Sequence, residues 1–207
     1  MFLIAGHPRS GTHFTKELLS KFGLDIRGEK YGRKQSLQEE DNVDGIVSWM
    51  HVYLFPEEFP VVLHQIRHPL QVIASSQTLY NNAFRRMFRQ IDAPKRWLLF
   101  THLRRKIPFP QETVTRWAMY TWLYWNEWIE TDSRVKHQYR VENIENEWYS
   151  ILDILDIPPL PMPELNTTVN TRKGRFQSLT WEQLYGIDPE LTDRIREKAI
   201  DYGYTLE

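Results

Sequence analysis

The chain has 207 residues, with 26 lysines and arginines against 27 aspartates and glutamates, and its formal net charge is −1 at pH 7. This balance gives no global electrostatic argument for a nucleic acid or a membrane surface as partner. Cysteine is absent, which excludes disulfides, thiol catalysis and cysteine-ligated metals and agrees with a reducing, cytoplasmic location.

The first residues predict a strand, a turn and a helix in immediate succession. The apolar run 2–6 indicates a buried strand, and a helical pattern begins at Thr12. Gly6 and Gly11 bound the turn between them, and a Gly-x-x-x-x-Gly spacing before a hydroxyl residue is close to a Walker P-loop. Backbone N–H groups and the positive end of the helix dipole meet in such a turn, which is typical of an anion site.

The lysine that a Walker loop needs just before its Ser or Thr is missing, and Arg9 lies inside the loop instead. Without that lysine, a nucleoside triphosphate hydrolase would lose its clamp on the β- and γ-phosphates. We therefore expect a loop that binds a phosphate-type anion, with a fixed positive charge near the group being transferred.

A second anion motif follows the apolar run 61–66, which predicts a strand buried on both faces. Arg67 comes directly after this strand, and Pro69 suits the first turn of the next helix. Ser75 lies eight residues beyond Arg67. An arginine fork together with a neutral hydroxyl donor is a suitable pair for a phosphate monoester.

Two later segments allow a structural and a functional interpretation. In the aromatic helix expected over 112–131, Trp117, Tyr120, Tyr124 and Trp128 recur every three or four residues. They predict one packed face, which we favour over a platform for stacking sugars. The basic stretch from 85 to 106 is predicted equally well as a solvated surface or as a collar that attracts an anionic acceptor.

Strands and helices alternate along the whole chain. The strands are expected at 2–6, 46–50, 61–66 and about 135–141. The helices are expected at 12–23, 69–80 extending toward 90, 112–131, 145–156 and 189–202. The alternation predicts a single α/β domain over 1–207, with three layers and a central parallel sheet of about four to five strands covered by helices on both faces, as in P-loop NTPases. Ligands of such folds lie at the C-terminal ends of the strands, where both anion motifs fall.

The two motifs together resemble those of sulfotransferases that use 3′-phosphoadenosine 5′-phosphosulfate (PAPS). Residues 8–12, Pro-Arg-Ser-Gly-Thr, closely resemble the family's 5′-phosphosulfate-binding loop, and the Arg67-to-Ser75 segment resembles its 3′-phosphate motif. Phe14 falls where the family often has a tryptophan that stacks on adenine. The resemblance implies that PAPS is bound, without a metal, by Pro8, Arg9, Ser10, Gly11, Thr12, His13, Phe14, Arg67 and Ser75.

Two weaker matches follow the same order. His51 falls where many cytosolic sulfotransferases carry a catalytic histidine, although the residues beside it differ from the family's. Arg172, Lys173 and Gly174 resemble the tripeptide that wraps the 3′-phosphate in that family. The resemblance implies two catalytic residues, Arg9, which stabilises charge on the bridging oxygen, and His51, which is the general base. Some family members use a carboxylate as the base, and Glu29, Glu39 and Glu40 are the alternatives to His51 here.

The chain also departs from the family. Residues 140–144, Arg-Val-Glu-Asn-Ile, stand where the family often has Arg-Tyr-Glu-Asp-Leu, and the family's dimer motif is not found, which leaves the oligomeric state open. Among the other histidines, His7 is expected to pack or bond locally, His64 to lie in the core, and His137 has no visible partner. No histidines or carboxylates have the spacing of metal ligands, so no metal site is expected.

The expected function is sulfuryl transfer from PAPS to a hydroxyl or amine of a small molecule or glycan, including an anionic one. No apolar run reaches eighteen residues, so we expect no membrane-spanning segment. Because the charge is balanced, we expect neither a membrane nor a nucleic acid as partner. Two alternatives remain. A P-loop nucleotide kinase would need a loop lysine and acidic Mg²⁺ ligands, whereas a non-catalytic nucleotide-binding module would differ from the enzyme only at Arg9 and His51.

Overall fold

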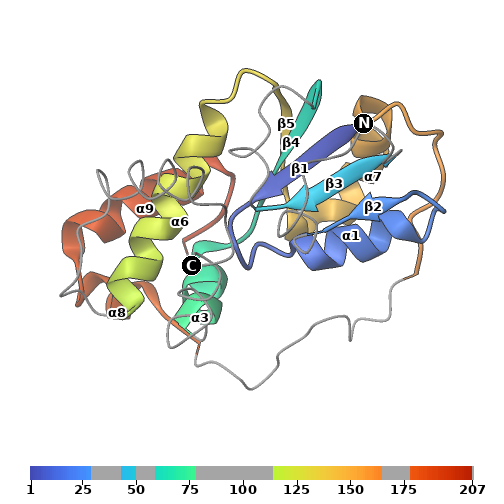
Figure 1. Cartoon of the computed structure of the whole chain (residues 1–207). Helices are drawn as coiled ribbons and strands as arrows, with labels where there is room; N and C mark the ends of the chain where they lie inside the picture. The colour runs from blue at the N-terminus through green and yellow to red at the C-terminus, as the bar shows by residue number, and fades with distance from the viewer. Residues whose placement is uncertain (29–42, 50–58, 78–113, 165–177, 207) are drawn as a thin grey trace. The chain divides into compact units, whose positions relative to one another are not determined.

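The computed structural model describes residues 1–28, 43–49, 59–77, 114–164 and 178–206. Within them, five strands form one parallel sheet in the order β2-β3-β1-β4-β5 (Figure 1). The strands are β1 (Phe2–Gly6), β2 (Ile26–Arg27), β3 (Gly45–Ser48), β4 (Val61–Ile66) and β5 (Val135–Arg140). The predicted α/β class and the parallel central sheet of about four to five strands are confirmed.

Strand β1 occupies the centre of the sheet, between β3 and β4. All five of its residues are buried. Since successive side chains of a strand point to opposite faces, the burial of both Leu3 and Ile4 means that the sheet is covered on both faces, as expected for a three-layer fold. The central position explains the run of apolar residues at the start of the chain.

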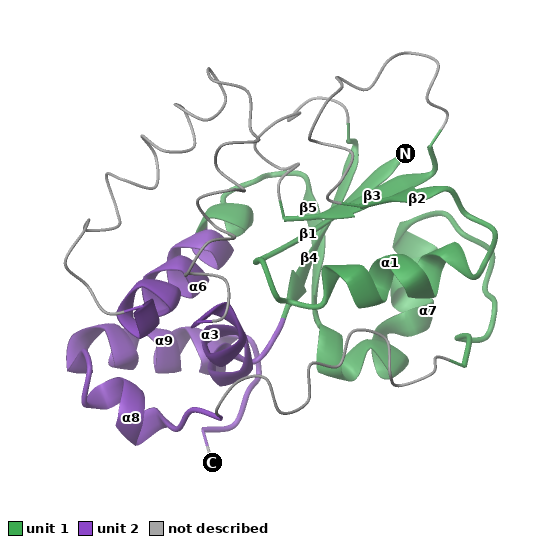
Figure 2. Cartoon of the chain, turned by 60° about the horizontal axis from the view of Figure 1, so that its bottom comes forward, with its two compact units in different colours: residues 1–66, 128–171 green, residues 67–127, 172–207 purple. Residues whose placement is uncertain are grey.

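The described helices differ greatly in length. They are α1 (Thr12–Ser20), α3 (Pro69–Gln77), α6 (Val114–Glu130), the 3₁₀ turn η2 (Val141–Asn143), α7 (Ile144–Ile154), α8 (Trp181–Tyr185) and α9 (Pro189–Asp201). The chain packs as two compact units (Figure 2), one formed by 1–66 with 128–171 and the other by 67–127 with 172–207. Each unit combines two separate segments of the chain, and the single domain over 1–207 stays a prediction.

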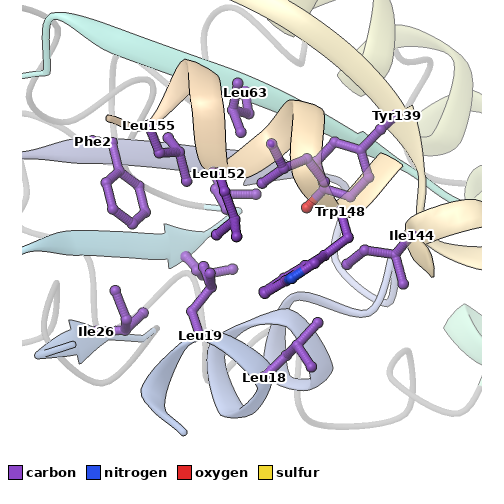
Figure 3. Packing of buried hydrophobic residues seen from close by; sticks show 13 residues of the cluster. Phe2, Leu18, Leu19, Ile26, Leu63, Tyr139, Ile144, Trp148, Leu152 and Leu155 are labelled. Atoms are coloured by element: carbon purple, nitrogen blue, oxygen red, sulfur yellow. The ribbon is translucent and has the colours of Figure 1, made fainter. Parts of the chain in front are cut away.

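The first unit contains the sheet and a hydrophobic cluster in which α1 and α7 meet one face of it (Figure 3). Helix α1 contributes Leu18 and Leu19, and α7 contributes Trp148 and Leu152. Burying a side chain of this size stabilises a fold by roughly 1.5–3 kcal/mol. The cluster therefore holds the helix that follows the first predicted anion motif firmly against the sheet.

In the second unit, helices α8 and α9 both begin at a side-chain N-cap. Asp188 caps α9 by accepting a hydrogen bond from the backbone N–H of Leu191 at 3.0 Å, and Pro189 occupies the first helical position. The Asp188 carboxylate also accepts one from Arg116 Nε at 2.8 Å, which ties α9 to α6. The short helix α8 was not predicted, although its capping box, Thr180 with Gln183, is visible in the sequence.

The predicted packed face of the aromatic helix α6 is wrong in part. Trp117 is buried as expected, but Trp122 and Trp125 are the most buried aromatic side chains of the helix. Tyr120 and Tyr124 are only half-buried and stack on each other, with ring centroids 5.8 Å apart. Aromatic residues recur on two sides of this helix, so periodicity alone could not decide which side faces the interior.

Gly45→Ala is expected to destabilise the protein. A Cβ atom at Gly45 would lie 2.4 Å from the ring of the buried Phe2, and overpacking of this kind costs roughly 1–3 kcal/mol. Urea unfolding measures the change. Gly186→Ala is the matched control, because its Cβ would have no neighbour closer than 3.5 Å and its backbone is already helical. Equal stability of the two variants would contradict this account of the β1–β3 contact.

Candidate anion-binding site

The loop between β1 and α1 leaves the sheet at the C-terminal end of its central strand. From β1 the chain builds β2 and β3 on one side and then crosses to build β4 and β5 on the other. Parallel α/β sheets bind their ligands beyond the carboxyl ends of the strands, at the point where the strand order reverses. Here that point lies beside β1, so the fold places residues 7–11 where a ligand is expected.

The backbone of this loop adopts unusual angles. Arg9 has φ 79° and Gly11 has φ 95°, both in the left-handed region, and Thr12 then begins the right-handed helix. The N–H of Ser10 donates to the His7 carbonyl at 2.9 Å and closes the turn. Alternating backbone handedness turns successive N–H groups toward one side and makes a concavity for an anion. A non-glycine residue in this region costs of order 1–3 kcal/mol, and such residues cluster at ligand sites.

The loop folds tightly over the end of β1. A Cβ atom on Gly6 would lie 2.4 Å from Ser10 Oγ and 2.8 Å from the backbone carbonyl of Gln65, so this position requires glycine. Ser10 is only 1% exposed, and its hydroxyl has no hydrogen-bond partner among the described residues. A buried hydroxyl without a partner is costly, so Ser10 is a candidate donor to a ligand of the loop.

The start of α1 leaves its dipole uncompensated. Gly11 is the N-cap residue, no side chain among the described residues caps this end, and the first turn contains no acidic residue. The first N–H groups of a helix have no partner within it, and together they carry about half a positive charge. The beginning of α1 therefore favours an anion supplied from outside the chain.

A buried amide beneath the loop joins four elements of the first unit. Gln65 in β4 is 0% exposed, and its Nε2 donates to the Ser10 carbonyl at 2.7 Å. Its Oε1 accepts from the Thr15 hydroxyl of α1 at 2.5 Å and from the Tyr139 hydroxyl of β5 at 2.8 Å. Burial raises the pKa of Tyr139, so this hydroxyl remains a donor.

His7 contributes no charge to the loop at neutral pH. It is buried, and its Nδ1 donates to the carbonyl of Pro8, as the expected local bonding implied. Burial lowers the pKa of His7 from its ordinary value of 6.5 to about 3, because the charged ring would lose its hydration. Arg9 is thus the residue of the loop that carries a permanent positive charge.

The remaining predicted loop residues differ in their surroundings. Pro8 and Thr12 are buried, whereas His13 is exposed on the first turn of α1. Phe14 is half-buried and packs against the hydrophobic cluster of the first unit. The stacking of Phe14 on an adenine stays a prediction. It would use the part of the ring that this packing leaves accessible.

The second predicted motif lies in the second unit, where Arg67 follows the last residue of β4. The Arg67 guanidinium donates from Nε and Nη2 to Gln71 Oε1 at 3.1 and 3.0 Å, and Trp122 Nε1 donates to the Arg67 carbonyl at 3.2 Å. Ser75 is 6% exposed in α3. Gln71, which is exposed and lies four residues before the buried Ser75, therefore orients the Arg67 guanidinium at the start of α3.

Four predicted site residues cannot be placed. His51, Arg172, Lys173 and Gly174 lie outside the described residues, as does the basic stretch from 85 to 106. The structure thus brings residues 8–12 together in one unit, and Arg67 with Ser75 in the other.

Sequence reasoning missed several polar contacts. It did not identify Gln65, although a glutamine inside a buried apolar strand must find partners and is for that reason a signal. It also predicted no partner for His137, and this is wrong, because His137 Nε2 lies 3.1 Å from Glu147 Oε2. The pair joins β5 to α7. Because a turn separates these two elements, the spacing of the two residues in the sequence does not reveal that they meet.

No group of three or more histidines, aspartates and glutamates able to hold a metal ion is found in the described part of the chain. None of the described helices is both long and apolar enough to cross a membrane. Comparison with protein-family models, with curated proteins and with solved structures gives no significant match to this chain.

The His7 environment predicts a specific acid sensitivity. Between pH 6.5 and about 3 the unfolded chain binds a proton at His7 that the folded chain does not. The unfolding free energy should therefore fall by about 1.4 kcal/mol for each unit that the pH decreases in this window. His7→Asn should remove this slope in urea titrations at several pH values, and the exposed His13→Asn should retain it. Identical slopes in wild type and His7→Asn would show that His7 is not held neutral.

Proposed function

We propose that the protein is a PAPS-dependent sulfotransferase with a P-loop-like fold. The observation that carries the proposal is the loop after β1. It combines an uncapped helix start, a buried Ser10 hydroxyl and an arginine in the left-handed region, and it lacks the lysine that triphosphate-binding loops carry directly after the second glycine. These features suit a phosphosulfate, which carries its own good leaving group and requires no Mg²⁺.

The chemistry follows from positioning and charge. Sulfuryl transfer, like phosphoryl transfer, moves the central group in line between two oxygens. The N–H groups of residues 10–12 would hold the 5′-phosphate, and Arg9 would stabilise the negative charge that develops on the bridging oxygen. Arginine stays protonated, so Arg9 would act as an electrostatic clamp and not as an acid. His51 is retained as the proposed general base for the acceptor hydroxyl or amine.

The 3′-phosphate is assigned to the second motif. The Arg67 guanidinium donates two hydrogen bonds to Gln71, which orients it, and it would hold the phosphate by a charge-assisted contact. Ser75 of α3 would add a neutral donor. Arg172, Lys173 and Gly174 are proposed as further contacts to this phosphate.

The acceptor is proposed to be a small molecule or glycan in the cytoplasm. A nucleotide kinase is the less favoured alternative, because residues 6–12 contain no lysine and no acidic group suited to Mg²⁺. A non-catalytic module that binds the product nucleotide would use the same loop, and only turnover separates it from the enzyme.

A binding titration tests the ligand class. The protein should bind 3′-phosphoadenosine 5′-phosphate without Mg²⁺ more tightly than ATP, as measured by calorimetry. Arg67→Ala should weaken this binding by roughly 2–4 kcal/mol, the scale for losing a charge-assisted contact, and should leave binding of adenosine 5′-phosphate nearly unchanged. Arg194→Ala is the matched control, because it removes another arginine of the same unit. Preference for ATP with Mg²⁺ would favour the kinase.

Arg9 is expected to act mainly in the transition state. Arg9→Ala should lower kcat with PAPS by about 10²-fold or more while the Kd of the nucleotide changes less. Arg9→Lys should retain part of the activity, because it keeps the charge. Arg9→Gly relieves the strained φ, so it should be at least as stable as Arg9→Ala and equally slow. A variant that loses binding but keeps turnover would contradict this role.

A further inference from the structure

We infer that Gln65 is a positioning residue that sets the direction of the Gly11 N–H and thereby the anion affinity of the loop. The inference rests on the anion-binding part of the proposed function and not on the identity of the nucleotide. Gln65 belongs to neither predicted motif, and it lies beneath the loop, where it does not itself face the proposed ligand.

The hydrogen bonds determine which way the Gln65 amide points. Both hydroxyl groups, from Thr15 and Tyr139, donate to Oε1, and the Ser10 carbonyl accepts from Nε2. The reverse orientation would place Oε1 against the Ser10 carbonyl, and two acceptors would then face each other in a fully buried position. Only one orientation therefore satisfies the three partners.

The orientation of the Gln65 amide in turn fixes the orientation of the Ser10–Gly11 peptide bond. In a planar trans peptide, the carbonyl of one residue and the N–H of the following residue point in opposite directions. The Ser10 carbonyl is held toward Gln65, so the Gly11 N–H points away from Gln65. The left-handed φ of Gly11 is compatible with this peptide orientation, and the same amide also holds α1 through Thr15.

The surroundings leave little room for another arrangement. A Cβ atom on Gly11 would lie 3.4 Å from Gln65 Nε2 and 3.1 Å from Val141 Cγ2, so the loop packs directly on the amide and on the residue that follows β5. An apolar side chain in place of Gln65 would leave the buried Ser10 carbonyl without its partner, and the Ser10–Gly11 peptide would be free to turn over.

Gln65→Glu tests the orientation with nearly the same shape. A neutral carboxyl group is able to donate to the Ser10 carbonyl, but a carboxylate would repel it. Burial raises the pKa of a carboxyl group, so both forms are populated within the working range of pH. We expect the variant to bind pyrophosphate within about threefold of wild type at pH 5 and at least tenfold more weakly at pH 8.5. A role that depends only on the shape of the side chain would not produce this dependence on pH, because the shape does not change when the carboxyl group ionises.

Calorimetry with pyrophosphate and with 3′-phosphoadenosine 5′-phosphate gives the affinities. The affinity of each variant is divided by the affinity of wild type at the same pH, so that changes in the ionisation of the ligand cancel. Tyr139→Phe is the matched control, because it removes one donor to Oε1 and keeps the Ser10 contact, and it should lose affinity only slightly and equally at every pH. Gln65→Met should lose at least tenfold throughout. If Gln65→Met does not fold, the change in the affinity of Gln65→Glu between pH 5 and 8.5 still decides.

The outcomes separate the two proposals. An affinity of Gln65→Glu relative to wild type that stays constant between pH 5 and 8.5 overturns the role of Gln65, as does a folded Gln65→Met that binds like wild type, or a wild type that binds neither anion. If Gln65→Glu follows pH but the bisphosphate nucleotide binds no better than pyrophosphate, the positioning role holds and the sulfotransferase proposal fails.

Discussion

The central strand of the sheet imposes the constraint on which the rest of the structure depends. Strand β1 is hydrogen-bonded on both sides, is buried on both faces, and ends at a glycine that has no room for a side chain. The chain must therefore turn sharply at Gly6, over the end of the sheet. The cluster formed by α1, α7 and the strands then holds the following helix in place. A rigid scaffold of this kind allows a strained loop to persist, because the surrounding packing determines its conformation.

The electrostatics of the loop come from fixed groups. The permanent charge of Arg9 and the uncapped start of α1 remain in place over the whole physiological range of pH, and burial keeps His7 neutral over the same range. The polar groups beneath the loop are paired through Gln65, so the carbonyl of Ser10 is satisfied inside the protein. N–H groups that point outward and carbonyls that are satisfied inward are what a preorganised anion site requires.

The two predicted anion motifs are related through the sheet. One follows β1 and the other follows β4, and these two strands are neighbours paired in parallel. The arginines in the two motifs have different surroundings. Arg9 lies in a strained turn, whereas Arg67 is oriented by Gln71 at the start of a helix. In the proposed function, Arg9 would stabilise charge that develops during transfer, and Arg67 would bind a charge that is already present.

The sequence by itself determined the parallel α/β architecture, the bounds of β1 and β4, and the loop between Gly6 and Gly11. These features depend on short-range information, namely apolar runs, glycine spacing and the first residues of helices. The contacts that shape the loop were decided only by the tertiary structure. Gln65 meets Ser10, Thr15 and Tyr139, which lie 50 or more residues away along the chain, and no local pattern encodes such partners. The inward side of α6 was decided in the same way, because two of its sides are aromatic and only the packing of the folded unit selects Trp122 and Trp125 for burial.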